Sequence, residues 1–120
     1  MTPLIPVMAG GAIGAALRYL TGLALPPRAG WPLGTLTVNI IGGLAMGLLA
    51  AAVMKGQASE AIRLFAGVGI LGGFTTFSAF SLEGFRMLDS GQWGLAISYA
   101  AVSVIASIGA VALGFALVRS

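Results

Sequence analysis

Hydroxyl groups that could contact an anion recur at helical spacing within the last apolar stretch of the sequence. Tyr99, Ser103 and Ser107 follow one another at intervals of four residues, so they share one face of a helix. Hydroxyl hydrogens can rotate toward an anion and replace its water molecules stepwise. Back-bonding of each hydroxyl to a carbonyl of its own helix is the alternative, and it explains a continuous stripe less well than a single serine.

Three further side chains within the apolar runs could also contact an anion. Asn39 lies deep in its run, where its NH₂ group can hold an anion or bond a neighbouring helix. Phe77 and Phe80 are three residues apart and share a face. The edge of a phenyl ring is positive and can face a small anion, although phenylalanines in such a run most often contact lipid or core.

Arg18, Thr35 and Glu83 complete the candidate set. Arg18 lies about seven residues before the end of its run, or roughly 10 Å of helix rise. It either extends to the interface or raises the anion concentration at the mouth of a pore. Thr35 belongs to the same small and polar face as Asn39. Glu83 is the only acid within a predicted span, and it either reaches the interface or joins the pore.

The composition requires that membrane spans position these residues. Of the 120 residues, 58% are hydrophobic and 8% are charged, whereas a soluble domain has about 25% charged residues. The chain has no Cys or His, which excludes disulfides, thiol and imidazole catalysis and the usual zinc sites. The six Lys and Arg residues form no basic patch, which argues against binding of nucleic acid. The prediction is an all-α membrane protein that is not an enzyme.

Four apolar runs divide the chain into predicted spans of a single transmembrane domain, residues 1–120. Adjacent glycines and adjacent threonines interrupt the third run and predict a helix that is broken near mid-membrane. Irregular backbone survives in hydrocarbon only where it is buried in protein or lines a cavity. A packing kink softened by glycine is the alternative. The spans cover residues 4–25, 32–54, 61–85 and 94–118.

The basic residues are almost evenly divided between the two sides of the membrane. Lys55, Arg63 and Arg119 fall on one side of the predicted spans, and Arg28 and Arg86 fall on the other. So small a bias permits insertion in both orientations, which predicts an antiparallel, dual-topology homodimer. Insertion in a single orientation, set by some other feature, is the alternative.

Four segments resemble the Fluc (CrcB-like) fluoride channel family over nearly the whole chain. The match comprises residues 10–19 (GGAIGAALRY), residues 34–42 (GTLTVNIIG), residues 72–80 (GGFTTFSAF), and the hydroxyl stripe Tyr99, Ser103 and Ser107. Ala79 departs from the pattern, because the family commonly has Thr there.

The resemblance implies an antiparallel dimer with two pores, each lined by both subunits, that exports fluoride across the cell inner (plasma) membrane. Phe77 and Phe80 match the pore phenylalanines, Asn39 matches the pore amide, and the hydroxyl stripe matches the fluoride track. The backbone carbonyls of Gly72 and Thr75 match those that hold a central structural sodium ion. No acid lies near the centre of a span, which favours passive conduction.

Two other kinds of membrane protein fit parts of the pattern. A dual-topology small multidrug exporter would exchange protons at an acid, typically in the first helix, where this chain has only Arg18. A structural subunit of a larger membrane complex explains the glycine content. It does not explain a broken span, a buried Asn39 and a hydroxyl stripe together.

Overall fold

A computed structural model describes residues 3–119 of the protein. Within this part of the chain, four helical segments are long and apolar enough to cross a membrane. The prediction of an all-helical membrane protein with four spans is therefore confirmed. The four segments are Leu4–Ala24, Leu33–Met54, Glu60–Asp89 and Trp93–Arg119.

A tight turn joins α1 (Leu4–Ala24) to α2 (Leu33–Met54). Arg28 and Trp31 exchange two backbone hydrogen bonds of 3.0 and 2.9 Å across this turn. The two residues between them, Ala29 and Gly30, have φ angles of 54° and 83°. Glycine adopts positive φ without steric penalty, whereas alanine does not. The turn therefore holds Ala29 in a strained backbone conformation.

The third segment consists of four helical pieces with a non-helical stretch before the last. In order they are α3 (Glu60–Ile62), the π-helical η1 (Arg63–Leu71), α4 (Gly72–Phe74) and α5 (Ser78–Asp89). Residues 75–77 lie between α4 and α5 and are not helical, and Thr75 has extended backbone with φ −86° and ψ 160°. We call residues 75–77 the non-helical stretch.

Helix α5 continues four residues beyond the predicted end of the third span, from 85 to Asp89. It stops where Gly91 adopts a φ of 80°. There the amide of Gly91 bonds the Leu88 carbonyl and the amide of Gln92 bonds the Met87 carbonyl. This pair of bonds is the Schellman arrangement that satisfies the last carbonyls of a helix. The helix thus ends just before a glycine with positive φ, and the charged residues Glu83 and Arg86 lie within it.

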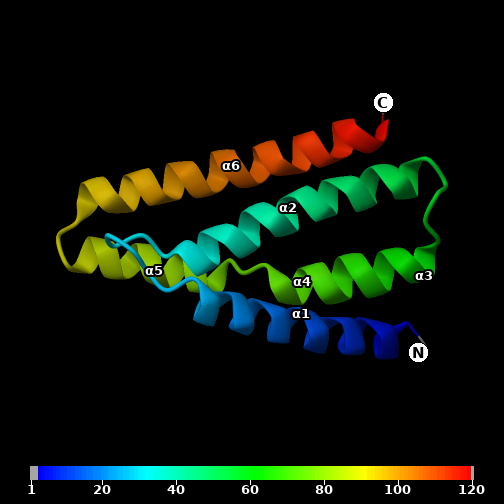
Figure 1. Ribbon diagram of the computed structural model, residues 1–120, viewed down its shortest axis with the longest axis horizontal. Coiled ribbons are helices and arrows are strands. Elements are labelled where there is room, and N and C mark those ends of the chain that lie inside the picture. Colours follow the sequence, from blue (N-terminus) through cyan, green and yellow to red (C-terminus); the bar gives the residue numbers. More distant parts are fainter. Residues whose placement is uncertain (1–2, 120) are drawn as a thin grey trace.

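Helices α2 and α6 (Trp93–Arg119) lie side by side, as Figure 1 shows. Glycines let their backbones approach closely. A Cβ atom at Gly43 would lie 2.8 Å from the Ser107 carbonyl oxygen, and one at Gly114 would lie 2.9 Å from the Leu48 amide. Small residues at helix interfaces favour such packing in lipid. The close approach brings the residues of α2 near the serines of α6.

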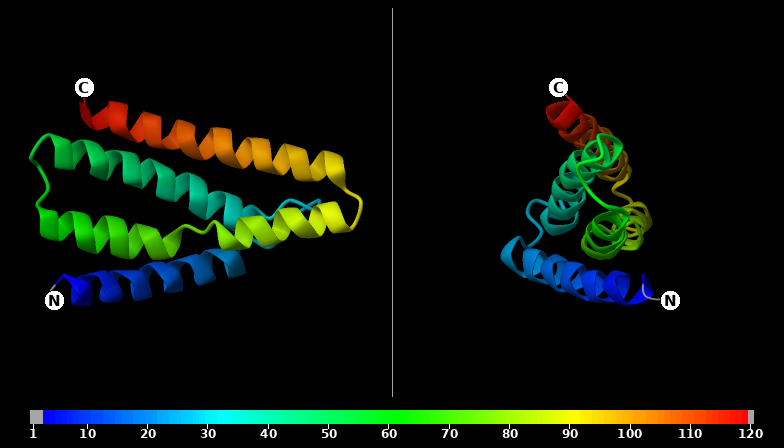
Figure 2. Two further views of the ribbon diagram at one scale, coloured as in Figure 1. Left: turned by 180° about the vertical axis from the view of Figure 1, so that it is seen from behind. Right: turned by 90° about the vertical axis from the view of Figure 1, so that its right-hand side faces the viewer.

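Helix α1 runs obliquely beneath η1 and α4, as the two views of Figure 2 show. A Cβ atom at Gly10 would lie 2.9 Å from the Ile70 amide, and one at Gly14 would lie 2.7 Å from the Phe74 amide. One helical turn after Gly14, α1 carries Arg18. This packing therefore places the Arg18 backbone next to the end of α4.

The start of α1 and the last turn of α6 lie at the same end of the molecule as the α2–α3 connection (Figure 1). The side-chain Nζ of Lys55, in this connection, donates a 2.9 Å hydrogen bond to the Val118 carbonyl near the end of α6. The α1–α2 and α5–α6 connections lie at the opposite end.

Candidate pore-lining site

An open pocket of about 400 Å³ lies between α2, α6 and the non-helical stretch. Five residues that the sequence singled out as pore residues line it together. The shared pocket shows that α2, the non-helical stretch, α5 and α6 bring these side chains to one place. The five are Asn39, Phe77, Phe80, Ser103 and Ser107, and the other lining residues are Gly42, Gly43, Met46, Thr75, Thr76, Val104, Ile108 and Val111.

The hydroxyl groups of Ser103 and Ser107 are buried and have no hydrogen-bond partner among the described residues. Ser103 as a whole is 6% exposed. Neither hydroxyl bonds a carbonyl of its own helix, so the back-bonding alternative does not hold for these two serines. A buried hydroxyl without a partner is unfavourable by about 1–3 kcal/mol, and a ligand or water in the pocket would relieve this.

A row of aromatic rings leads to the pocket and ends at Phe77. The ring centroids of Trp31 and Tyr99 are 5.9 Å apart, those of Tyr99 and Phe80 are 5.2 Å apart, and those of Phe80 and Phe77 are 5.6 Å apart. Phe77 is 78% exposed, whereas Tyr99 is fully buried. The ring of Phe77 is therefore the end of the row that a ligand or a partner can reach.

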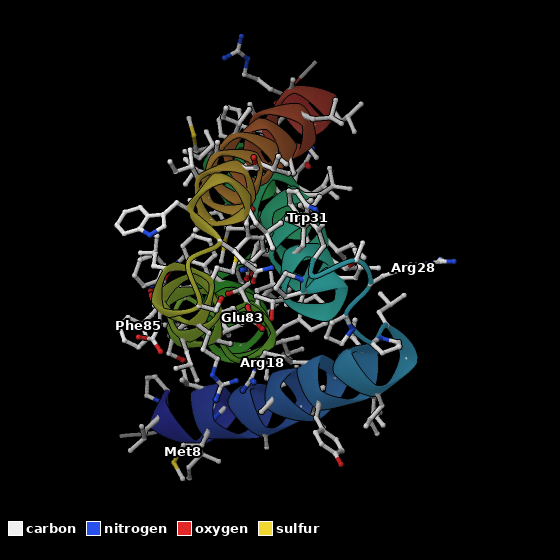
Figure 3. The ribbon with its side chains drawn as sticks, turned by 90° about the vertical axis from the view of Figure 1, so that its left-hand side faces the viewer. Met8, Arg18, Arg28, Trp31, Glu83 and Phe85 are labelled. Atoms are coloured by element: carbon white, nitrogen blue, oxygen red, sulfur yellow. The ribbon has the colours of Figure 1, made fainter. Side chains whose placement is uncertain are left out.

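The hydroxyl of Tyr99 is bonded, unlike those of the two serines. It donates a 2.8 Å hydrogen bond to Oε1 of Glu83, and the hydroxyl of Thr35 donates a 2.8 Å hydrogen bond to Oε2 of the same carboxylate. In Figure 3, Glu83 points into the interior between the helices. Tyr99 and Glu83 are not among the residues that line the 400 Å³ pocket. The predicted hydroxyl stripe thus divides into a bonded end and an unbonded end.

Asn39 holds the non-helical stretch by two hydrogen bonds. Its Nδ2 donates to the Thr76 carbonyl at 3.0 Å, and its Oδ1 accepts from the Thr76 amide at 2.8 Å. The sequence did not single out Thr76 as a site residue. Its Oγ1 also accepts a 3.1 Å hydrogen bond from the Ala79 amide, which satisfies a free donor at the start of α5. A threonine just before a helix start is the signal that could have identified it.

Arg18 lies at the opposite side of the non-helical stretch from α6. Its Nε donates a 3.1 Å hydrogen bond to the Gly73 carbonyl. A second pocket, of about 240 Å³, is lined by Arg18, Thr35, Thr76 and Ala79 among others. Arg18 therefore points inward in Figure 3, whereas Arg28 points away from the helices. Ala79, where the family pattern commonly has Thr, faces this second pocket.

The carbonyl oxygens of Gly72 and Thr75 accept no hydrogen bond from any described residue. Gly73 accepts from Arg18 and Thr76 accepts from Asn39, whereas the Phe74 carbonyl, like those of Gly72 and Thr75, has no donor among the described residues. The amide and hydroxyl of Thr75 both donate to the Leu71 carbonyl, at 3.0 and 2.9 Å. The described residues contain no cluster of three or more Asp, Glu, His or Cys side chains. Free carbonyls are accordingly the oxygen ligands that this region offers a cation.

The fold and the pocket together define a multi-pass helical membrane protein with a mainly apolar pocket among its spans, lined in part by two phenylalanines and by buried hydroxyls. Residues 5–115 match the model of the family described as CrcB-like protein, Camphor Resistance (CrcB), so the chain belongs to that family. The resemblance seen in the sequence is confirmed.

Proteins named "Fluoride-specific ion channel FluC" are similar to this chain over nearly its full length. The protein from Hyphomonas neptunium is 50% identical, and alignment covers 99% of this chain and 97% of the relative. The protein from Sphingopyxis alaskensis is 48% identical, with the same coverage. The protein from Caulobacter sp. (strain K31) is 47% identical, covering 99% of this chain and 96% of the relative. These relatives are channels rather than enzymes, as predicted for this chain.

Proposed function

We propose that this chain is a subunit of a fluoride-selective channel, through which fluoride leaves the cell passively. One observation carries the proposal: the pocket that joins Phe77 and Phe80 to Ser103 and Ser107 contains two buried hydroxyls without partners. An anion is the ligand that such donors suit, because a hydroxyl can point its hydrogen at it. The relatives are named fluoride-specific ion channels, which supports fluoride as this anion.

The pocket replaces water around fluoride with neutral donors. The two serines offer hydroxyl hydrogens, and Phe77 and Phe80 offer positive ring edges. Asn39 uses one of its two amide hydrogens on the Thr76 carbonyl and keeps the other for the ion. Neutral donors bind an anion without trapping it, as conduction requires. A negative-inside potential drives fluoride outward by about 2.3 kcal/mol per charge across roughly 100 mV.

The channel is proposed to be an antiparallel homodimer with two pores in the cell inner (plasma) membrane. Its support is the open, mainly apolar pocket, which carries the exposed ring of Phe77 on a surface that a second copy would cover. The near balance of basic residues between the two ends fits insertion in both orientations. Reporter tags on the C-terminus are expected on both sides of the membrane, and labelling on one side only would remove this arrangement.

A structural sodium ion is proposed at the carbonyls of Gly72 and Thr75, with the non-helical stretch near mid-membrane. The support is that these two carbonyls lack donors among the described residues, while side chains of other helices bond the Gly73 and Thr76 carbonyls. Carbonyls of unwound helices are sodium ligands in membrane proteins. A bound ion would neutralise the negative end of the helix that finishes at α4.

Fluoride flux from liposomes that contain only the purified protein tests the channel function. We expect rapid release of fluoride down its gradient and no release of chloride. A multidrug exporter or a structural subunit would release neither ion. Equal release of both ions would contradict fluoride selectivity.

A further inference from the structure

We propose that Arg18 is a positioning residue of the cation site, and that it acts through its Nε–H group rather than through its charge. The inference rests on the proposed sodium site at Gly72 and Thr75. Arg18 touches neither of these carbonyls. It bonds the carbonyl between them in the chain, that of Gly73, at 3.1 Å.

Side chains from two other helices hold the backbone on either side of Phe74 and Thr75. Arg18 of α1 bonds the Gly73 carbonyl, and Asn39 of α2 bonds both the backbone amide and the backbone carbonyl of Thr76. Of the two residues between these anchors, Phe74 is the last residue of α4 and Thr75 has extended backbone. Removing either anchor would leave this backbone restrained by the other anchor and by the bonds of Thr75 to the Leu71 carbonyl. Together the two anchors fix where the free carbonyls point.

The geometry of the peptide bond shows how the Asn39 anchor orients the Thr75 carbonyl. The Thr75 carbonyl and the Thr76 amide belong to one trans peptide group, so they point in opposite directions. Because Oδ1 of Asn39 accepts from that amide at 2.8 Å, the Thr75 carbonyl points away from Asn39 and α2. Arg18 performs the corresponding role at the end of α4. It occupies the Gly73 carbonyl, while the Gly72 carbonyl, about 100° around the helix, stays free.

The glycine packing of α1 brings Arg18 within reach of Gly73. A Cβ atom at Gly14 would lie 2.7 Å from the Phe74 amide, and one at Gly73 would lie 3.1 Å from the Gly11 Cα. The two backbones therefore touch one turn before Arg18. From there only the first part of the arginine side chain, as far as Nε, is needed to reach the carbonyl.

The position of the donor atom allows a test that separates hydrogen bonding from charge. In arginine, Nε is attached to Cδ. In glutamine, Nε2 is attached to Cδ in the same position, so Arg18→Gln can keep the hydrogen bond without the charge. Lysine keeps the charge, but it has a carbon in that position and its Nζ lies one bond farther out. A positive charge next to a cation site also disfavours the cation, so its loss does not weaken sodium binding.

The test measures how the thermal stability of the purified protein in detergent depends on sodium, with choline replacing sodium at constant ionic strength. A ligand that binds only the folded state raises the melting temperature with its concentration. The sodium midpoint is the sodium concentration that gives half of the full rise in melting temperature. We expect the midpoint of Arg18→Gln to stay within about threefold of the wild-type value. We expect Arg18→Lys and Arg18→Met to raise it by about tenfold, as loss of one such hydrogen bond implies.

The two exposed-site variants Arg28→Gln and Arg28→Lys are the matched controls, and neither should move the midpoint. If Arg18→Lys has the wild-type midpoint while Arg18→Gln binds sodium more weakly, the charge of Arg18 is what matters and the proposal is wrong. The proposal would also be overturned if Arg18→Gln and Arg18→Lys weakened sodium binding equally or if neither changed it. Failure of Arg18→Gln to fold would overturn it too. A wild-type protein whose stability ignores sodium would remove the cation site itself, whatever its fluoride flux.

Discussion

The hydroxyl stripe of α6 has two ends that differ in one respect. At one end, Tyr99 donates to Glu83, which also accepts from Thr35, so each of these polar groups has a partner. At the other end, the hydroxyl oxygens of Ser103 and Ser107 are buried, yet they have no partner among the described residues. Polar groups that satisfy one another hold a structure together, whereas buried groups left unpaired are available to a ligand.

This difference implies two distinct kinds of mutant. Substitutions among the paired groups should lower stability first and alter flux as a consequence. Substitutions around the unpaired groups should lower fluoride flux while the protein stays folded. The four predictions below test this division, from the largest expected effect to the smallest.

Asn39→Ala should have the largest effect, because Asn39 belongs to the paired groups as well as to the pocket. It leaves the amide and the carbonyl of Thr76 without partners. We expect the free energy of unfolding to fall by about 4 kcal/mol, since each unpaired buried group is unfavourable by about 1–3 kcal/mol. Chemical unfolding in detergent measures this change. Gln57→Ala removes an amide from an exposed position and is the control, and an equal loss in both variants would contradict the assignment.

Phe77→Ile and Phe80→Ile should abolish most fluoride flux, because isoleucine has no positive ring edge. If the lost contact leaves about 3 kcal/mol of fluoride dehydration unbalanced, flux falls by about a hundredfold. Phe85→Ile is the control, since Phe85 is 60% exposed and does not line the pocket. Liposome flux is the measurement. Wild-type flux in both pocket variants would leave Asn39 and the serines to select the ion.

Tyr99→Phe should destabilise the protein by about 2 kcal/mol, because it removes a hydrogen bond to a carboxylate and keeps the ring. Thr35→Val tests the other donor to Glu83 in the same way. Chemical unfolding again supplies the measurement, with Tyr19→Phe at an exposed position as the control. If Tyr99→Phe lowered flux but left stability unchanged, Tyr99 would belong with the unpaired groups.

Ser103→Ala should lower fluoride flux by about tenfold, which corresponds to about 1.4 kcal/mol for one lost donor. Stability should stay equal or rise, because the variant removes a buried hydroxyl that has no partner. Ser98→Ala, on the exposed face of the same helix, is the control. Reduced stability without a change in flux would show that Ser103 serves packing.

The sequence predicts which residues share a face more reliably than which atoms they bond. The spacing of four residues places Ser103 and Ser107 together, and the structure puts them in one pocket with Asn39 and Phe77. The same spacing does not reveal that Tyr99 donates to Glu83, because that bond depends on how α5 and α6 cross. Hydrogen bonds between helices depend on packing that periodicity does not describe.

The interruption of the third span shows a second limit of the same kind. Adjacent glycines and threonines identify the region where the helix is weak. They do not identify Thr76 as the residue that Asn39 holds, or Gly73 as the residue that Arg18 holds. Each of these bonds joins a backbone group to a side chain more than thirty residues away along the chain. Local propensity carries no information about such a partner.

The lengths of the helices have a consequence for the lipids around the protein. Helix α6 has 27 residues and α1 has 21, which correspond to lengths of about 40 and 31 Å. A hydrocarbon layer of about 30 Å matches α1, whereas α6 must tilt to fit within it. Trp93 and Arg119 at its two ends suit the opposite interfaces and would anchor that tilt. Because α6 carries both serines of the pocket, a thicker or thinner bilayer would change the angle at which they meet α2.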